Sequence, residues 1–339
     1  MRRRRAGRER RSRAIVAPPP GCAEDSVVLT FDVPREFSGV RLDRFVQWRI
    51  PRLSRSRAQA IVRACAVRED GSRRRPSDIV KFGETVILVR ESFDEPEVPL
   101  DYGILLDDGA VLAIDKPAGL PMHPTASYHK HTLSYQLRER YSDGDAFVPA
   151  IAHRLDRETS GVVLCGRTRE AERRLKMSFE AHRVDKTYLA IVHGELPDEG
   201  EIDAPMAAVR EGLHVMMEVR RDGLEAHTRY RVRERRGGRS LVELSPRTGR
   251  QHQLRVHLAS VGHPIVGDKL YGADREAPFL EYIETGMTPE LEQRLGHPRQ
   301  ALHAHAVHFE HPETAEAMTV RAPLSPDLQA LWGRAGSVA

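Results

Sequence analysis

The chain has 339 residues, of which 40% are hydrophobic and 30% charged, with a formal net charge of +4. This length suits a small domain plus a larger one with a folded core. No apolar run approaches the roughly 18 residues that cross a membrane, and the basic N-terminus lacks the apolar stretch of a secretory signal. The widely spaced Cys22, Cys65 and Cys165 predict reduced thiols, two of them buried, rather than a disulfide framework.

Positive charge is concentrated in two N-terminal segments. Residues 1–13 hold eight arginines and one glutamate, and residues 41–81 hold twelve Arg or Lys against four Asp or Glu. A polyanion would therefore be bound there, through phosphate contacts and the release of counterions. Residues 1–25, rich in arginine and then in proline, predict a disordered basic tail, for which a purely solubilising role is an equal alternative.

Residues 26–90 have the pattern of a small α/β domain. Its elements are a strand over 27–31, a helix from residue 41 and, after a second helix, a turn and strand over 81–89. Ser54 is the expected N-cap of the second helix. Apolar residues recur at helical spacing along that helix and place its arginines on the opposite side. The apolar set is Ala58, Ile61, Val62 and Cys65, and the arginines are Arg55 and Arg57.

This order of elements, with the stretch SRSR and the closing GETVILV, resembles the RNA-binding domain of the S-four type, named after a small-subunit ribosomal protein. The usual Asn-Gly turn of that family is replaced here by Asp70 and Gly71. The resemblance implies that Arg55 and Arg57 bind RNA. A generic helical adaptor with solvated arginines is the alternative interpretation.

A linker and a second domain follow. Residues 91–100 are acidic and contain proline, which is typical of a linker. We place the second domain over residues 101–330 and its first strand at 111–114. Residues 115–124 then predict a rigid loop, because proline and glycine interrupt the pattern.

The segment HRLDRETSG, residues 153–161, precedes the apolar run 162–165 and so lies at the mouth of a predicted buried strand. It contains Asp156 between two arginines. Flanking cations keep a carboxylate ionised, which suits a nucleophile or a base. The closing serine and glycine permit a tight turn. An isolated Arg-Leu-Asp-Arg stretch is more often a solvated surface loop.

Residues 185–194 predict a strand, along which Tyr188, Ala190 and Val192 share one face. A tyrosine at the start of such a face can stack on a flat base while its hydroxyl reaches a polar partner. A single tyrosine in this setting is more often part of the core.

Residues 247–258 follow another strand and predict an amphipathic helix. Its apolar positions are Leu254, Leu258 and Val261, with Gln251 and Arg255 on a second, polar stripe. An arginine held by a packed helix is a good partner for a carboxylate. Basic residues on a capped surface helix are the simpler interpretation of any one arginine.

Taken together, HRLDxxTSG, Lys-x-Tyr-x-Ala and GRxHQxRxH occur in the order of the RluA-type family of RNA pseudouridine synthases, which residues 27–325 resemble. The resemblance implies an α+β fold, in which the catalytic domain is built on a mixed, mainly antiparallel sheet with flanking helices. The implied reaction is isomerisation of uridine to pseudouridine in RNA, with no metal and no organic cofactor. Segments 115–124, 262–272 and 302–305 also resemble family segments, which we interpret as the rim of the site and as scaffold.

The resemblance also assigns roles to single residues. Asp156 is the catalytic residue, Tyr188 stacks on the base and Arg255 pairs with Asp156. Arg154 fills the space left by an extruded nucleotide. The further residues that we expect to bind substrate or RNA are His153, Arg247 and Arg250, the two arginines contacting phosphate or supporting the helix.

Two functions of other classes are the alternatives. One is an RNA-binding or ribosome-assembly factor without activity, against which the intact Asp156, Tyr188 and Arg255 argue. The other is a metal-dependent hydrolase that uses some of the sixteen histidines, but HExxH, cysteine pairs at ligand spacing, GxGxxG, a P-loop and G-x-S-x-G are all missing. We expect large-subunit ribosomal RNA as the partner, with transfer RNA second, and a cytoplasmic monomer that binds no membrane.

Overall fold

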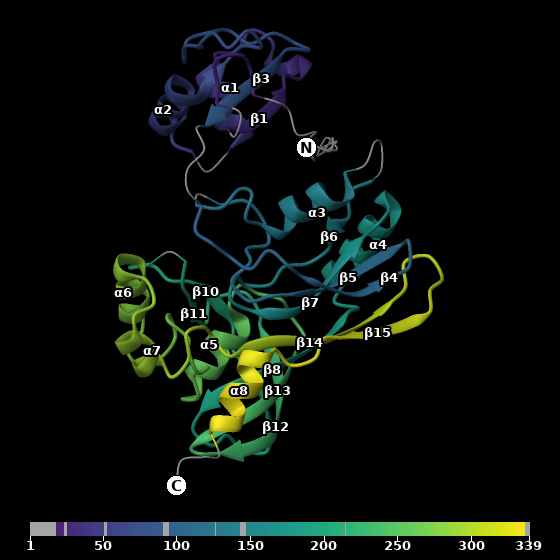
Figure 1. Ribbon diagram of the computed structural model, residues 1–339, viewed down its shortest axis with the longest axis vertical. Coiled ribbons are helices and arrows are strands. Elements are labelled where there is room, and N and C mark those ends of the chain that lie inside the picture. Colours follow the sequence, from purple (N-terminus) through teal and green to yellow (C-terminus); the bar gives the residue numbers. More distant parts are fainter. Residues whose placement is uncertain are drawn as a thin grey trace. The chain divides into compact units, whose positions relative to one another are not determined.

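Two units, Met1–Asp94 and Glu95–Ala339, make up this computed structural model (Figure 1). The division falls within the predicted linker 91–100. Most of the predicted tail and residues 91–94 of the linker lie outside the described residues. The structure describes residues 18–23, 26–50, 53–90, 95–125, 127–142, 147–213 and 215–335. Among these, no helix is both long and apolar enough to span a bilayer.

The first unit is a three-stranded antiparallel sheet with two helices. The strands β1 (Val27–Asp32), β3 (Thr85–Arg90) and β2 (Ala66–Val67) lie in that order. The short 3-10 turn Arg35–Phe37 and the helices α1 (Leu42–Arg49) and α2 (Arg55–Cys65) lie between β1 and β2 in the chain. All four elements predicted here are confirmed.

The cap and the faces of α2 are as the sequence predicted. The hydroxyl of Ser54 accepts the N–H of Arg57 at 3.2 Å. Ala58 and Val62 are fully buried in the core of the unit, whereas Arg55 and Arg57 are exposed. The helix therefore presents to solvent two arginines that make no ion pair with other described residues.

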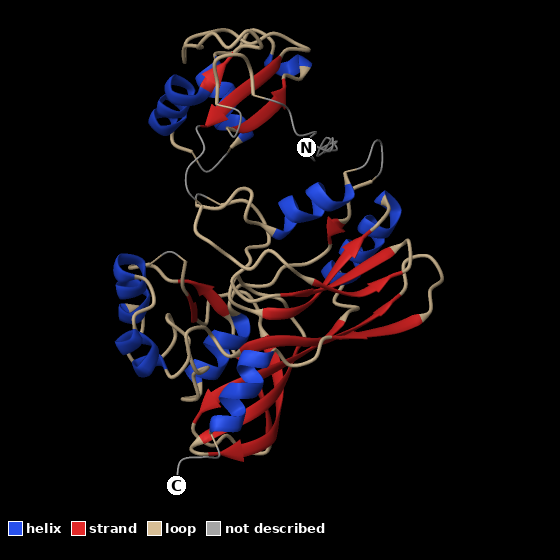
Figure 2. Cartoon of the chain, viewed as in Figure 1, coloured by secondary structure: helices blue, strands red, loops and turns tan. Residues whose placement is uncertain are grey.

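The second unit is built on a ten-stranded mixed sheet, of order β4-β5-β7-β14-β8-β13-β12-β9, with β6 paired to β7 and β15 to β14 (Figure 2). Its strands are β4 (Gly103–Asp107), β5 (Val111–Lys116), β6 (Ala150–Ile151), β7 (Ser160–Gly166), β8 (Asp185–His193), β9 (Glu199–Asp203), β12 (His227–Arg236), β13 (Arg239–Pro246), β14 (Leu302–Glu310) and β15 (Ala317–Arg321). Among the strand pairs of the described residues, only β7 and β14 run parallel. The predicted mixed, mainly antiparallel sheet is confirmed.

Helices cover this sheet on both faces at the β5–β7 end. α3 (Leu133–Tyr141) packs on Leu112 and Ile114 of β5, whereas α4 (Arg169–Glu180) packs on Val111 and Ala113. Side chains alternate along a strand, so a strand buried on both faces must be apolar throughout. This explains the unbroken apolar run of β7, which is buried along its whole length.

The remaining helices pack around the other end of the sheet or on the ladder β10 (Met206–Ala208) and β11 (Met217–Val219). They are α5 (Gln253–Ser260), α6 (Ala277–Thr285), α7 (Pro289–Leu295) and α8 (Pro326–Arg334). α5 and α8 share one apolar cluster with β8 and β13.

Three sequence expectations were wrong. The second unit begins with β4, one strand before the predicted one at 111–114. Only Cys165 is buried among the cysteines, and Cys22 and Cys65 are half-buried. The helix α5 is not amphipathic, because Leu254 packs toward the sheet while Val256 packs toward the β10–β11 ladder. It also starts after Gln251, and Val261 lies beyond its end, 44% exposed.

We predict that Gly161→Ala destabilises the second unit strongly. Gly161 has φ +110°, and a Cβ there would lie 2.2 Å from the carbonyl oxygen of Ala304 on β14. The expected loss is about 3 kcal/mol or more in the free energy of unfolding. Urea unfolding followed by Trp332 fluorescence in a Trp48→Phe background measures it. Gly109→Ala is the matched control, since Gly109 has φ +89° but open space around it, and it should lose only about 1–2 kcal/mol. Equal losses in the two variants would contradict the proposed clash.

Candidate active site

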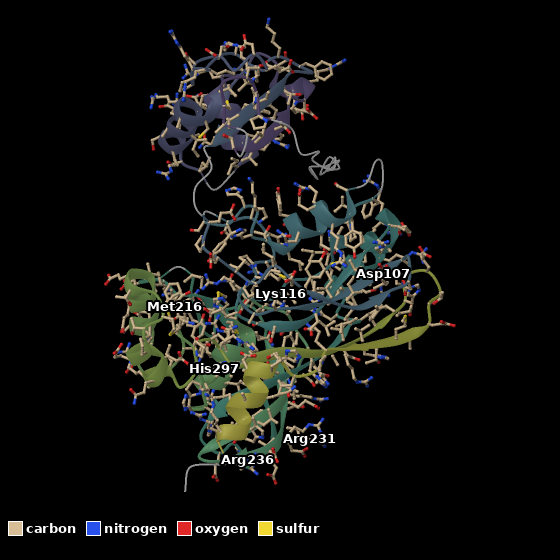
Figure 3. All side chains as sticks on the ribbon, viewed as in Figure 1. Asp107, Lys116, Met216, Arg231, Arg236 and His297 are labelled. Carbon is tan, nitrogen blue, oxygen red and sulfur yellow. The ribbon has the colours of Figure 1, made fainter. Side chains whose placement is uncertain are left out.

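The loop that carries Asp156 is anchored by the apolar core and by a buried lysine. Leu155 is buried in the cluster that also contains α3 and β5. Lys116 lies at the end of β5, where Figure 3 labels it. Its ammonium donates to the carbonyls of Pro117, Leu120 and Arg157 at 2.8, 3.0 and 3.1 Å. Burial lowers the pKa of Lys116 to about 7. The backbone on both sides of Asp156 is therefore fixed before any substrate binds.

Arg255 on α5 lies between two carboxylates. Its Nη1 donates to Asp156 Oδ2 at 3.2 Å. Its Nε and Nη2 donate to the two oxygens of Asp268 at 2.6 and 2.8 Å. Asp268 also accepts the backbone N–H groups of Leu270 and Tyr271. The ion pair predicted between Arg255 and Asp156 is thus present, and a second carboxylate that was not predicted orients it.

These contacts decide the charge of both partners. Burial by itself would raise the pKa of Asp156, but the charge of Arg255, with a hydrogen bond from Gln300, holds it below its ordinary value. Burial would lower the pKa of Arg255, but Asp268 and Asp156 raise it above its ordinary value. Asp156 is therefore an ionised carboxylate throughout the neutral pH range.

The two oxygens of Asp156 differ. Oδ2 accepts from Arg255 and, at 3.5 Å, from Gln300, whose amide also donates to Thr159 at 2.7 Å. Oδ1 has His252 Nε2 as a neighbour at 3.9 Å, which is beyond hydrogen-bond distance. One oxygen is thus held by the protein, and the other is available to a reacting atom.

Tyr188 lies near the start of β8, opposite Leu244 of β13 and Ala304 of β14. It packs against the apolar cluster around Leu155 and lines the same cavity as Asp156. Burial, and to a smaller degree the charge of Asp156, raises the pKa of its phenol. The ring is therefore a neutral, flat surface beside the carboxylate, as base stacking requires.

Asp156, Tyr188 and Arg255 all line one cavity of about 320 Å³. It lies on the face of β8 that carries Lys186 and Tyr188, and the loop before α5 closes one side. Six of the predicted site residues line it: His153, Arg154, Asp156, Tyr188, Arg250 and Arg255. Its lining does not include Arg247, which is exposed after β13. Arg55 and Arg57 belong to the other unit.

The predicted RNA-binding residues of the cavity differ in how many contacts they already make within the protein. The ring of His153 accepts the N–H of Leu164 at 3.0 Å and stacks on Phe179 at 4.4 Å. Burial lowers its pKa to about 3, so it is a neutral part of the wall. Arg250 donates from Nε to the carbonyl of Glu225 at 3.0 Å. Arg154 is exposed, and its guanidinium has no hydrogen bond or ion pair with any other described residue. Binding of RNA by these residues stays a prediction.

The chain is similar in sequence to proteins of one enzyme family. The family model described as RNA pseudouridylate synthase matches residues 110–260. The ribosomal large subunit pseudouridine synthase D of Xanthomonas campestris is 39% identical over 91% of this chain and 92% of its own length. That of Pseudomonas aeruginosa is 36% identical over 91% and 95%.

This chain belongs to the RNA pseudouridine synthase family. An RNA pseudouridine synthase of Chloroflexus aurantiacus, described as uncharacterized, is 37% identical over 91% of this chain and 92% of its own length. Among solved structures, human RNA Pseudouridylate Synthase Domain Containing 4 is 26% identical, with a TM-score of 0.54 over 68% of this chain and 92% of that one. The family and the isomerase class predicted from the motifs are confirmed.

Sequence reasoning missed several residues of this pseudouridine synthase site. Asp268 lies in segment 262–272, and Gln300 lies two residues before segment 302–305. Both segments were interpreted as scaffold more than chemistry. His252 is within the quoted GRxHQxRxH stretch but received no role. Lys116 lies in the segment expected at the rim, yet it acts beneath the aspartate loop. These residues lie in or next to recognised motifs, and that closeness could have marked them as candidates. Their contacts with distant segments of the chain leave no pattern that the sequence alone would show.

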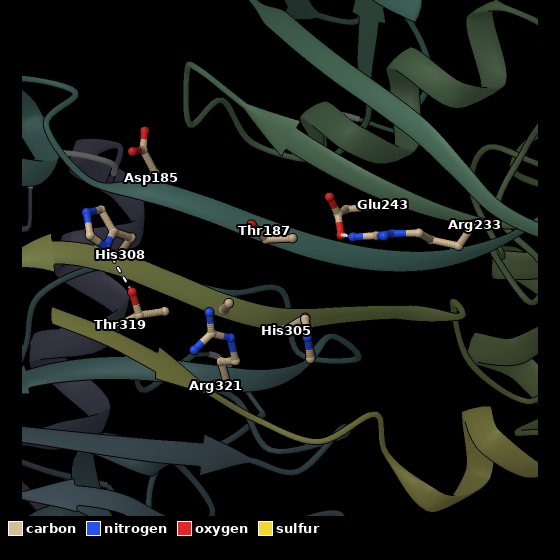
Figure 4. Close-up of a pocket in the computed structure, with 9 residues that line it drawn as sticks. Asp185, Thr187, Arg233, Glu243, His305, His308, Thr319 and Arg321 are labelled. Atoms are coloured by element: carbon tan, nitrogen blue, oxygen red, sulfur yellow. Dashed lines mark hydrogen bonds and ion pairs between the residues drawn. The ribbon is translucent and has the colours of Figure 1, made fainter. Parts of the chain in front are cut away.

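A second cavity, of about 300 Å³, lies on the opposite face of β8, which carries Asp185 and Thr187 (Figure 4). Arg233 is ion-paired with Glu243, and His308 bonds to the hydroxyl of Thr319. Arg233 and Glu243 therefore neutralise each other within this second cavity. Within the part of the chain that the structure describes, no three His, Cys, Asp or Glu side chains are grouped to hold a metal ion.

We predict that Arg255→Met costs about 3–5 kcal/mol in the free energy of unfolding, because it leaves two carboxylates close together without their shared cation. Urea unfolding monitored by Trp332 measures the loss. Arg154→Met is the matched control: it removes an arginine from the same cavity wall, but one that is exposed and unpaired, and should change stability by less than about 0.5 kcal/mol. A similar stability for both variants would mean that the buried ion pairs do not hold the site together.

Proposed function

We propose that this protein isomerises specific uridines to pseudouridine in large-subunit ribosomal RNA, with Asp156 as the catalytic residue. The observation that carries the proposal is the ionised carboxylate of Asp156, which lines the cavity and which Arg255 holds by Oδ2 only. The names of its relatives, ribosomal large subunit pseudouridine synthases, support this substrate. We retain the prediction of a cytoplasmic monomer.

Access to the sugar requires that the nucleotide leaves the stack. Carbon 1′ of a stacked or paired uridine cannot reach a half-buried carboxylate inside a cavity, and extruding the nucleotide costs a few kcal/mol. Arg154 supports this step, because its exposed guanidinium lies beside the cavity and has no partner in the described protein. It fills the space that the nucleotide leaves and contributes its charge among the phosphates.

The chemistry then proceeds at Oδ1 of Asp156. This oxygen either attacks carbon 1′ or removes a ribose proton, and in both routes the bond between carbon 1′ and N1 breaks. The electron pair leaves with the base, which becomes a uracil anion. Arg255 keeps the carboxylate ionised and oriented during this step.

The uracil anion must turn before it rejoins the sugar through carbon 5. As carbon 5 bonds to carbon 1′, the ester bond to Asp156 breaks in the first route, and in the second Asp156 returns the ribose proton that it removed. The flat ring of Tyr188 supports the turning base by stacking. Carbon 5 finally loses its proton. Because the raised pKa keeps the phenol of Tyr188 protonated, it can accept that proton only while passing its own proton on.

Capture of the RNA is assigned to the first unit. Arg55 and Arg57 are exposed on α2 and make no side-chain ion pair with other described residues. Arginines of this kind attract phosphate, whereas the arginines of β12 in the second unit are neutralised. Arg229 and Arg231, for example, pair across the strands with Glu201 and Glu199.

We predict that Asp156→Asn abolishes pseudouridine formation and leaves RNA affinity within about twofold, because the amide keeps the shape but not the charge. Ribosomal RNA from a strain lacking the gene, incubated with wild type or variant and mapped for pseudouridine, provides the test. Positions modified by wild type identify the target. Turnover by the variant within tenfold of wild type would refute the role of Asp156. Binding without turnover by wild type itself would favour an RNA-binding factor.

We predict that the double variant Arg55→Gln/Arg57→Gln weakens RNA binding and lowers the slope of log affinity against log salt by up to about 2, one phosphate contact per arginine. Arg229→Gln/Arg231→Gln is the matched control, since these arginines are already paired with glutamates. Filter binding over a series of salt concentrations measures both. An unchanged slope in the first variant would mean that α2 does not contact RNA.

A further inference from the structure

His252 lies at the one oxygen of Asp156 that the protein leaves open. It is the residue before α5, has φ +55°, and accepts the N–H of Val256 on its carbonyl. Its side chain is 8% exposed, lines the cavity, and places Nε2 3.9 Å from Oδ1. Left-handed backbone at a residue other than glycine is uncommon and is often found at functional sites. The mechanism above does not use this imidazole.

The hydrogen bonds fix which ring nitrogen carries the proton. The hydroxyl of Tyr271 accepts the N–H of Met217 at 2.9 Å and lies 2.7 Å from His252 Nδ1. Nδ1 is the one acceptor that the described residues offer to the phenol proton, and on that ground we assign the hydroxyl of Tyr271 as the donor and Nδ1 as the acceptor. The proton of the neutral imidazole is then on Nε2, on the side of Asp156.

The surroundings keep this imidazole neutral. Burial lowers the pKa of His252 to about 4, and the nearby charges of Arg255 and Arg154 act in the same direction. Asp156 and Asp268 oppose them but do not outweigh them. At neutral pH the ring is therefore a hydrogen-bond donor at Nε2 and carries no charge.

We propose that His252 is a further catalytic residue, whose Nε2–H donates a hydrogen bond to O2 of the target pyrimidine as the base departs. The inference rests on the proposed function. The position supports it: O2 is two bonds from N1, so it lies beside carbon 1′ when carbon 1′ is at Oδ1. A donor 3.9 Å from Oδ1 borders the same space.

The charge balance explains why a neutral donor fits this reaction. When the bond between carbon 1′ and N1 breaks, its electron pair goes to the base and is shared by N1 and O2. A hydrogen bond from Nε2–H stabilises that charge where it develops. A neutral imidazole is too weak an acid to transfer the proton, so the base stays an anion and can form the new bond through carbon 5. An imidazolium would protonate it and remove the electron pair that carbon 5 needs.

The first test compares two variants of the full-length protein in single-turnover conversion of a ribosomal RNA fragment that contains the mapped target. His252→Leu removes the donor and is expected to be about 100-fold slower with RNA affinity within twofold. His252→Gln, whose amide nitrogen can reach the place of Nε2, should stay within about tenfold of wild type. His308→Leu, at an exposed histidine that lines the second cavity, is the matched control and should match wild type.

The second test identifies the acceptor. The same fragment is made with 2-thiouridine at the target, because sulfur is a weak hydrogen-bond acceptor. With O2 present, wild type should exceed His252→Leu by about 100-fold, and with sulfur in its place the ratio should fall below about fivefold. A ratio that stays near 100 would overturn the assignment to O2, since the imidazole would then act on another atom.

A third variant keeps the inference testable if His252→Leu does not fold. Tyr271→Phe leaves the imidazole in place but removes the hydroxyl that fixes its tautomer, and should be about tenfold slower on uridine, with a smaller loss on 2-thiouridine. If the variants of His252 and of Tyr271 all react at the wild-type rate, the role of His252 is refuted while the proposed function stands. If wild type forms no pseudouridine in any ribosomal RNA, the proposed function fails and the inference falls with it.

Discussion

The site depends on how Arg255 divides its hydrogen bonds. Two of its N–H donors go to Asp268 and one to Asp156. A forked, bidentate contact with Asp156 itself would occupy both oxygens of that carboxylate. The present arrangement gives Asp268 the forked contact, so Arg255 keeps Asp156 ionised through Oδ2 and leaves Oδ1 open. Asp268 can serve this purpose because its own oxygens are further satisfied by two backbone N–H groups.

The surrounding network extends this rigidity to the whole aspartate loop. Lys116 holds the carbonyl of Arg157, and Arg299 holds that of Glu158 at 3.0 Å. Ser160 is bonded to His303 of β14 at 2.9 Å. All three partners lie far from the loop in the chain, so the loop is fixed by tertiary contacts rather than by its own sequence. Arg154, by contrast, is exposed and its guanidinium pairs with no other described residue, so it is available to phosphate.

Features that depend on residues close together in the chain could be predicted from the sequence, and most of those that join distant segments could not. The strands and helices of the first unit and the cap at Ser54 are set by local sequence patterns and were predicted from them. The mixed sheet of the second unit was predicted only through the family resemblance. The pairing of Arg255 with Asp156 was predicted through the motif resemblance. The difference between the two oxygens of Asp156 could not be, because Gln300 and His252 approach it from remote segments. The burial of α5 on both sides was also missed, since its second cover, the β10–β11 ladder, consists of two strands of three residues each.

The burial of α5 explains why so many polar residues flank Arg255 in the sequence. A helix enclosed on two sides must satisfy every polar group that it carries, because a buried unpaired group costs free energy. Gln253 does so with Thr248, Thr228 and the backbone of His227 and Arg250, and His257 with Thr228 and Ala204. These two residues bind no reacting atom in our scheme. They allow a charged helix to stay inside the protein, and only inside can its arginine act on Asp156 with little screening by water.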